Sequence, residues 1–486
     1  MEKWLTPRTT VFLVGALTLW RLYLSATLQL HPDEAYYWLW SRNLDISYFD
    51  HPPMVAVFIW LTTLFSQTEV WVRLSGQLVF VLASGLLWRL AWQWSGSVAV
   101  AAGSVILLNV YPLTMLGLTV MTPDVPVFLF WALGVSLFWQ ILRSGQAWLW
   151  YPLGGVFGLA LASKYTAVLM APCIFLYLLL TPERRWLKTV HPYGALLLGC
   201  LCFLPVLVWN SKHDWVSFTF QFRNGLNSQV YSLGHVVEYL AGQMLITSPI
   251  AWVLGVYVAL LALVRKDRPT LLLVCLSLPV IAFFGVSSLK KVAGANWPAF
   301  AYFTLSALVA RYCLGDHSTR ARRVAWLLAA ASGLALSMLL TAHARFNVIP
   351  LARYSEAAAT ADATNGFHGW KELTDALQQY PAHRYVVTPS HQLSAEVMYY
   401  SGGNLPARTA RMTRPSQFNL WDWTQDMQGT DGLYLWSDGD FIGHEGARFA
   451  APSVSTAIDV HRDGKPIRRY HLIPGGATQT PPFPGN

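Results

Sequence analysis

Hydrophobic residues in this chain gather in long continuous runs, and short polar segments separate these runs from one another. An α-helix needs about 20 apolar residues to cross the ~30 Å hydrocarbon core of a bilayer. Runs of this kind lie near residues 10–30, 70–92, 97–117, 123–143, 148–163, 165–181, 190–210, 249–264, 270–287, 295–314 and 324–342. The pattern therefore predicts an α-helical polytopic membrane protein with about eleven transmembrane helices.

The segment between the first two runs, residues 31–69, begins with too many polar residues to cross a membrane. It contains HPDEAYYWLWSRNL and then HPPMVAVFIWLTTLF, and both stretches are amphipathic and rich in aromatic residues. Helices of that composition tend to lie along the membrane interface. We therefore expect interfacial amphipathic helices in this first external loop.

The chain changes character after residue 344. GWKELTDALQQY has the hydrophobic period of an amphipathic helix, whereas RYVVTPS and GLYLWS are typical of short strands. We expect a transmembrane domain over residues 1–344 and a small α/β domain over residues 345–486. The final stretch, GGATQTPPFPGN, has the composition of a disordered end.

Composition agrees with the membrane class. Of the 486 residues, 54% are hydrophobic and 12% are charged, which is about half the charged fraction of a soluble chain. The five cysteines lie in or beside apolar runs, and the polar tail has none. Their spacing indicates neither a disulfide framework nor a metal-binding cluster.

The net charge of +9 is unevenly distributed along the chain. Residues 1–344 hold 22 Lys and Arg against 12 Asp and Glu, whereas residues 345–486 hold 12 against 13. The basic residues of the first part sit in short loops between apolar runs, which is unlike a basic patch for nucleic acid. With a cytoplasmic N-terminus, 14 basic residues fall on the inside and 7 on the outside. This asymmetry predicts a cytoplasmic N-terminus and an external tail.

Three carboxylates stand at the predicted outer ends of membrane helices. Asp33 and Glu34 follow the first run, and Asp124 opens the fourth run. Acidic residues in the first turn of a helix also stabilise the helix dipole, and for either site alone this capping role is an equal alternative. Two such sites on one face, beside aromatic amphipathic stretches, favour a catalytic role.

Three lysines on the predicted outer face go against the inside preference of basic residues. Lys164 falls between two apolar runs, and Lys290 and Lys291 precede the tenth run. Ionisable groups at a membrane edge are costly, and an anionic lipid phosphate would stabilise them. The alternative is that each lysine extends its amine to ordinary lipid headgroups.

Two histidines are the remaining candidates for binding a metal ion. His31 and His51 each precede a proline, which breaks the helical spacing that a metal site on one helix face needs. The sequence therefore predicts no metal-ligating residues and no certain cofactor, while a divalent metal stays open.

At these residues the chain resembles a known family. HPDEAYYW, YFDHPP, MTPD, ALASKYTA and RPSQFNLW resemble segments of bacterial relatives of protein O-mannosyltransferases and lipid A aminoarabinose transferases. These are C-type glycosyltransferases of the inner membrane, similar to glycosyltransferase family 39, that use polyprenyl-phosphate sugars. The resemblance covers essentially the whole chain, and HPDEAYYW with YFDHPP is its most specific part.

The resemblance implies roles for individual residues. Asp33 matches an essential acidic residue of the first external loop, and Asp124 matches a second essential Asp. Lys164 matches the lysine between the fifth and sixth helices, while Tyr37 and Tyr48 match aromatic residues of the first loop. The implied acceptors are lipid A, a core glycan or a protein on the periplasmic side.

One departure from the family pattern concerns the sugar. Aminoarabinose transferases have Lys where this chain has His51, and a different residue pattern around Tyr36. The YFDHPP version therefore indicates another branch, one that handles galacturonic acid, mannose or another hexose. The sequence names neither the sugar nor the acceptor.

The predicted external lysines and carboxylates also fit the chemistry of sugar transfer, independently of the resemblance. A sugar on polyprenyl phosphate already has a good leaving group, so transfer needs cations for the departing phosphate and a carboxylate for the acceptor hydroxyl. We expect Asp33 to be the base and Asp124 to orient a substrate beside it. No P-loop, Rossmann glycine pattern or nucleotide-sugar acidic pair occurs in a polar segment.

Other function classes stay as alternatives. A transporter would show internal repeats and broken helices meeting at the bilayer midplane, and no convincing repeat is present. A lipid-linked glycan ligase or polymerase would share the topology and the lipid donor but use a long glycan. A non-catalytic scaffold would need no carboxylates beside out-of-place lysines.

Overall fold

The chain folds as two compact units in the computed structural model. The structure describes residues 4–226, 231–265, 268–380, 383–409, 414–421, 431–438 and 455–475. The first unit comprises Met1–Ser25 and Asp45–Thr341, and the second comprises Ala26–Leu44 and Ala342–Asn486. The second unit thus includes the HPDEAYYW segment, which the division at residue 344 assigns to the transmembrane domain.

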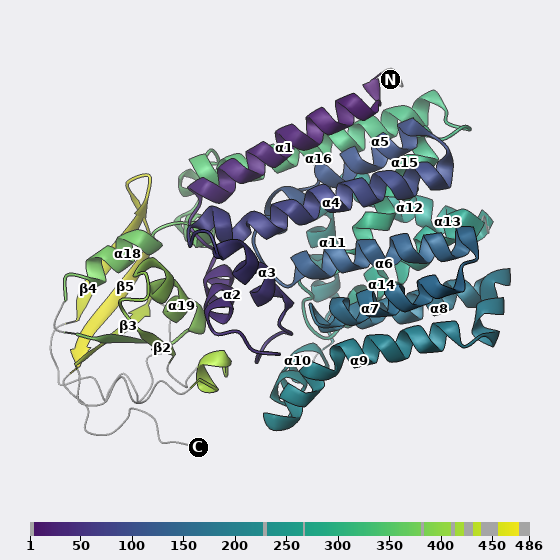
Figure 1. Ribbon diagram of the computed structural model, residues 1–486. Helices are drawn as coiled ribbons and strands as arrows, with labels where there is room; N and C mark the ends of the chain where they lie inside the picture. Colours follow the sequence, from purple (N-terminus) through teal and green to yellow (C-terminus); the bar gives the residue numbers. More distant parts are fainter. Residues whose placement is uncertain are drawn as a thin grey trace. The chain divides into compact units, whose positions relative to one another are not determined.

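Helices build the whole of the first unit as far as it is described (Figure 1). They are α1 (Pro7–Thr27), α3 (Met54–Thr63), α4 (Glu69–Ser95), α5 (Val98–Asn109), α6 (Asp124–Ser144), α7 (Trp150–Leu161), α8 (Met170–Leu180), α9 (His191–Lys212), α10 (Val216–Leu226), α11 (Leu233–Thr247), α12 (Pro249–Arg265), α13 (Arg268–Cys275), α14 (Leu278–Ser287), α15 (Ala301–Leu314) and α16 (Arg320–Phe346). A π-helical turn, η2 (Leu113–Gly117), follows α5, and the 3-10 segments are η3 (Ala147–Leu149), η4 (Tyr165–Leu169) and η5 (Pro182–Lys188).

Within the described residues, six helices are long and apolar enough to cross a membrane. Two further pairs of helices are each bent at a short break, and the number of spans rises to eight if each pair crosses the membrane as one span. Four shorter apolar helices accompany them. The prediction of a multi-pass helical membrane protein is therefore confirmed, while the number of eleven spans stays a prediction. The helix over Leu233–Thr247 was not predicted, because His235, Glu238 and Gln243 interrupt its apolar run.

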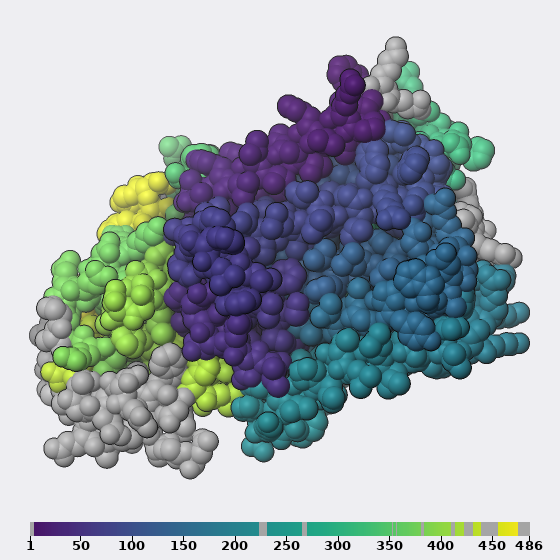
Figure 2. Space-filling view, in the orientation of Figure 1, coloured from purple at the N-terminus to yellow at the C-terminus, as the bar shows by residue number. Residues whose placement is uncertain are grey.

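Large apolar side chains remain exposed on the outer helices of this unit. Figure 2 shows α1, in purple, along one edge of the helical unit and teal residues of α9 and α10 along the opposite edge. Examples on these helices are Val11, Phe12 and Leu19 of α1 and Leu197, Leu201 and Leu204 of α9. Exposed apolar surface of this extent is stable against lipid and costly against water.

Close packing of α7 against α9 sets the position of the turn that follows α7. A Cβ atom at Gly158 would lie 2.6 Å from the carbonyl oxygen of Gly199, which is closer than real Cβ contacts allow. Small residues let helix backbones approach in this way inside membranes. Lys164 lies three residues after the end of α7, so this contact helps to hold it.

The second unit combines helices with a five-stranded sheet (Figure 1). Its helices are α2 (Pro32–Arg42), α17 (Glu356–Thr360), α18 (Trp370–Leu377) and α19 (His391–Tyr400), with 3-10 segments η6 (Leu351–Arg353), η7 (Ala363–Phe367) and η8 (Gln417–Asn419). Its strands are β1 (Tyr385–Thr388), β2 (Ala407–Thr409), β3 (Gly432–Ser437), β4 (Thr456–Arg462) and β5 (Lys465–Gly475). The helix α18 and the strands β1 and β3 lie where the sequence pattern predicts them.

The strand order is β2-β1-β3-β5-β4. β1 pairs in parallel with β2 and β3, with Val386 opposite Leu433, whereas β3, β5 and β4 pair antiparallel. Val386, Leu433 and Leu435 are fully buried, so the sheet carries the core of this unit. The predicted disordered end, apart from Gly475, lies outside the described residues.

Backbone hydrogen bonds build residues 26–44 into the second unit. The Gln29 N–H donates to the Phe367 carbonyl at 3.2 Å, and the Gln29 side-chain oxygen accepts from the Trp370 N–H at 2.7 Å. The Leu30 N–H donates to the Tyr400 hydroxyl at 2.7 Å, and α2 packs on α19. Since buried backbone groups need partners, these bonds fix where α2 begins.

Candidate active site

Three polar side chains meet in the first unit. Asp124 opens α6, Lys164 stands in extended conformation between α7 and η4, and Asn296 lies in the segment before α15. The Lys164 amine is 2.6 Å from Asp124 Oδ1, and the Asn296 amide donates to Asp124 Oδ2 at 2.7 Å. The Lys164 and Asp124 side chains are 9% and 4% exposed. We call these residues the Asp124 cluster.

The contacts in this cluster differ between its two charged residues, Asp124 and Lys164. Both carboxylate oxygens of Asp124 accept a hydrogen bond, so the group is held as an acceptor. An ammonium carries three donors, and among the described residues Asp124 is the side-chain partner of Lys164. Lys164 therefore keeps N–H donors for a further anion. The negative charge of Asp124 offsets the free-energy cost of burying the positive charge of Lys164.

The first loop packs against the same turn. The Met54 N–H at the start of α3 donates to the Ala162 carbonyl at 3.2 Å, two residues before Lys164. His51 lies just upstream and is half-buried, and its carbonyl accepts from the Tyr48 N–H at 3.2 Å. The YFDHPP segment and the lysine of ALASKYTA thus belong to one local structure.

Tyr48 is fully buried in this loop. Its hydroxyl accepts from the Asp45 N–H at 2.9 Å, and the Asp45 carboxylate accepts from the Trp209 indole at 2.8 Å. Burial raises the pKa of Tyr48 above its ordinary value, and the hydrogen bond from the Asp45 backbone opposes this shift. Tyr48 is therefore a neutral phenol that fixes the loop against α9.

The other two predicted lysines lie in the turn after α14. Lys290 is half-buried with its amine 6.0 Å from the Tyr231 ring centroid, and Lys291 is exposed. Neither pairs with a carboxylate among the described residues. They stand in the segment that carries Asn296, and the structure does not bring them into contact with Lys164.

The second unit holds the other predicted carboxylates. Asp33 is half-buried near the start of α2, and its Oδ1 accepts from the Gln392 amide at 2.7 Å. Glu34 is fully buried, and its Oε2 accepts from the His31 N–H at 2.9 Å, while the His31 ring accepts from the Asp33 N–H. His31 and Glu34 thus form a capping box. These are the contacts of a helix cap, and they leave Asp33 as the more accessible carboxylate.

A histidine and an arginine lie beside Asp33. The Arg414 guanidinium donates to His391 Nε2 at 2.9 Å. Burial lowers the pKa of His391 to about 3, the charge of Arg414 lowers it as well, and Asp33 acts in the opposite direction. Because a guanidinium can only donate, Nε2 is unprotonated and the imidazole is neutral. We call Asp33, Gln392, His391 and Arg414 the Asp33 cluster.

Aromatic side chains tie this cluster to the RPSQFNLW segment. Tyr36 meets the His391 ring edge-on at 4.6 Å, and its hydroxyl accepts from the Gln417 N–H at 2.7 Å. Tyr37 is buried and packs edge-on against Trp40 at 4.9 Å. Two motifs about 380 residues apart therefore form one structure, in which Tyr37 is part of the packing.

Sequence reasoning did not single out Asn296, Gln392, His391 or Arg414. Asn296 stands just before an apolar helix, which is the signal that identified Asp124. Arg414 begins the RPSQFNLW motif. Gln392 and His391 carried no signal, because nothing local relates them to Asp33.

No group of three or more His, Cys, Asp or Glu side chains is arranged to hold a metal ion within the described residues.

Comparisons with known proteins find similarity to membrane glycosyltransferases. Residues 50–209 match the profile of the dolichyl-phosphate-mannose-protein mannosyltransferase family. A curated relative, the lipid A galacturonosyltransferase RgtD of Rhizobium johnstonii, is 28% identical over 326 residues. That match covers 61% of this chain and 64% of the relative, so it spans less than two thirds of the relative's length.

The fold is similar to that of ArnT from Cupriavidus metallidurans. The structure of ArnT bound to undecaprenyl phosphate matches with a TM-score of 0.67 at 16% identity, covering 96% of this chain and 98% of that one. The apo structure of the same protein matches with a TM-score of 0.65. Together the comparisons confirm the similarity to bacterial C-type glycosyltransferases that the motifs indicate.

Proposed function

We propose that this protein is a polyprenyl-phosphate-sugar-dependent glycosyltransferase of the bacterial inner membrane, which transfers a single sugar to lipid A on the periplasmic side. The observation that carries the proposal is the buried amine of Lys164, which Asp124 holds and only partly satisfies. A cation of this kind at the end of a membrane helix suits a lipid-linked phosphate.

Lys164 binds the phosphate that leaves. During transfer the acceptor oxygen bonds to the anomeric carbon, and the bond from that carbon to the phosphate oxygen breaks. The electron pair of the broken bond stays on the phosphate, where the Lys164 ammonium stabilises it. Lys290 and Lys291 supply further positive charge on the segment that carries Asn296, and His51 and Tyr48 shape the loop beside Lys164.

Asp33 accepts the proton of the acceptor hydroxyl. Its Oδ1 is oriented by Gln392, and Oδ2 has no partner among the described residues. Asp124 suits this role less well, because Lys164 and Asn296 occupy both of its oxygens. Asp124 is therefore a positioning residue for Lys164. Glu34 supports Asp33 by capping α2, and Tyr37 supports it through packing.

The proposed sugar is galacturonic acid. The curated relative is a lipid A galacturonosyltransferase, and His51 stands where aminoarabinose transferases have Lys. Arg414, beside Asp33 in the second unit, offers a guanidinium that suits a sugar carboxylate. A lipid-linked glycan ligase would use the same leaving group, and donor size separates the two functions.

The test is deletion of the gene in its host followed by mass analysis of lipid A, core and envelope glycans. Loss of one uronic acid residue from lipid A, restored by the wild-type gene and not by Asp33→Asn, supports the proposal. Lipid A of unchanged mass with loss of a long glycan would instead identify a ligase. A variant at an exposed acidic residue of the second unit, Glu372→Gln, serves as the matched control.

A further inference from the structure

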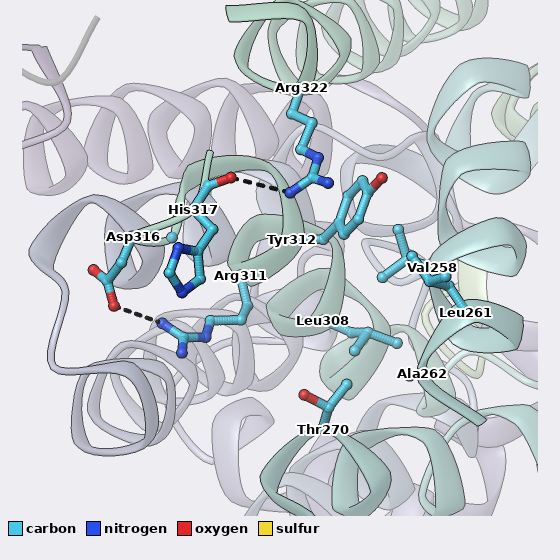
Figure 3. A pocket seen from close by; sticks show the side chains of 11 residues that line it. Val258, Leu261, Ala262, Thr270, Leu308, Arg311, Tyr312, Asp316, His317 and Arg322 are labelled. Atoms are coloured by element: carbon cyan, nitrogen blue, oxygen red, sulfur yellow. Dashed lines mark hydrogen bonds and ion pairs between the residues drawn. The ribbon is translucent and has the colours of Figure 1, made fainter. Parts of the chain in front are cut away.

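A second charged pocket lies in the first unit, where α15 ends and α16 begins, with α12 as its wall (Figure 3). Its volume is about 210 Å³. Asn296 of the Asp124 cluster stands five residues before α15, whereas the pocket is at the last turn of that helix. Fourteen helical residues rise about 21 Å, so the pocket is at the opposite end of the bundle and separate from the cluster.

The pocket joins an apolar wall to a cationic rim. Val258 and Leu261 of α12 and Leu308 of α15 line the apolar side. Arg311 and Arg322 line the rim, and Figure 3 shows Arg322 beside the Tyr312 ring and Arg311 directed toward Asp316. This combination fits a ligand with one anionic end and one apolar end.

The two guanidiniums are held in place but retain capacity for an anion. Arg311 Nη1 is buried without a hydrogen-bond partner and lies 3.6 Å from Asp316 Oδ2, whose side chain is 74% exposed. Arg322 stacks 4.4 Å over the Tyr312 ring and donates from Nη1 to the His317 carbonyl at 3.1 Å. The residues that line the pocket include two arginines and one carboxylate, which is solvated, so the lining is net positive. Guanidinium groups bind phosphate oxygens through paired hydrogen bonds.

The helices that flank the pocket carry exposed apolar side chains. They are Leu260, Leu263 and Val264 on α12 and Val324, Leu327 and Leu328 on α16. A lipid whose phosphate enters this pocket can place its acyl chains along these faces. We propose that the pocket binds the headgroup of an anionic phospholipid, at the end of the bundle opposite the Asp124 cluster. Basic pockets between membrane helices recognise such headgroups.

The proposal is tested on the full-length protein in detergent by native mass spectrometry and thermal unfolding. Phosphatidylglycerol is the probe, with phosphatidylcholine as the zwitterionic control and inorganic phosphate as the soluble anion. We expect selective retention of phosphatidylglycerol by the wild type. The variant R311Q/R322Q should bind it with about 10- to 100-fold weaker affinity, which corresponds to the loss of a charged hydrogen bond. The variant R311K/R322K keeps the charge but loses the paired hydrogen bonds and the stacking of the guanidinium, so its affinity should lie between those of the wild type and R311Q/R322Q.

Arg320 provides the matched control, because it is exposed in the same segment and does not line the pocket. Arg320→Gln should bind phosphatidylglycerol as the wild type does. Three results would overturn the proposal: equal retention of phosphatidylcholine, undiminished binding in R311Q/R322Q, or equal protection by inorganic phosphate. Transfer activity reports on the Asp124 cluster, so it distinguishes a misfolded variant from one that has lost only this pocket.

Discussion

The amine of Lys164 lies 2.6 Å from the carboxylate of Asp124, and both side chains are at least nine-tenths buried. Forty residues separate them in the sequence. Neither charge would be stable alone in such a buried place, so each side chain stabilises the charge of the other.

Removal of one partner of this pair should damage folding as well as function. Lys164→Ala leaves the Asp124 carboxylate without its cation, at a cost of about 3–5 kcal/mol in the free energy of unfolding. The variant Lys164→Met with Asp124→Asn removes both charges and should recover most of that stability without recovering transfer. Thermal unfolding in detergent and a transfer assay measure the two effects. Near wild-type transfer by the double variant would exclude Lys164 from phosphate binding.

Asp33→Asn should lower the rate of transfer by about 10²–10⁴-fold while it changes stability little. Asparagine keeps an oxygen for the Gln392 amide but cannot take up the acceptor proton. Glu372→Gln alters another first-turn carboxylate of the same unit and should leave the rate unchanged. If Asp33→Asn transfers sugar as fast as the control, the base lies elsewhere.

Gln392→Ala should lower the rate of transfer more than it lowers thermal stability. The Gln392 amide orients Asp33 Oδ1, and a base that is not held in position takes up a proton less efficiently. A transfer assay and thermal unfolding in detergent measure the two effects. A transfer rate at the wild-type level would show that Gln392 does not orient the base.

The second unit should lose stability on acidification through His391. Its pKa is about 3 in the folded protein and about 6.5 in an unfolded chain. Between these values the unfolded chain binds more protons, so stability is complete above about pH 6.5 and falls as the pH drops toward 3. His391→Gln should flatten this dependence between pH 6.5 and 4.5 in thermal unfolding. If the thermal stability of the wild type and of His391→Gln changes with pH by the same amount, His391 does not cause the loss of stability.

The orientation predicted from basic residues can be tested with reporters. Alkaline phosphatase fused after Arg345 should be active, because we expect the second unit to be periplasmic. A fluorescent protein that folds only in the cytoplasm should be dark at the same position. A bright fluorescent fusion would place the second unit inside and remove the basis for an external site.

The sequence predicted the helical membrane class well because a span requires a long apolar run, which any composition window detects. It missed α11, whose Glu238 and Gln243 break that run. Glu238 is exposed, whereas Gln243 is buried and hydrogen-bonded to the Tyr302 hydroxyl and the Ala295 carbonyl. It identified Asp124 and Lys164 separately but not as a pair, because no local rule relates positions 40 residues apart. For the same reason the partners Asn296 and Gln392 were not found, and α2 was not assigned to the tail.

The attachment of residues 26–44 to the second unit has a consequence for biosynthesis. The partners of Gln29, Trp370 among them, are made about 340 residues after it. At about 5–20 residues per second this delay is roughly 20–70 s. During that interval the nascent chain inserts its membrane helices while its acidic motif has no native partner. A ribosome that stops before residue 370 therefore releases a membrane-inserted protein in which Asp33 lacks Gln392, so the Asp33 cluster forms only after residue 414 has been translated.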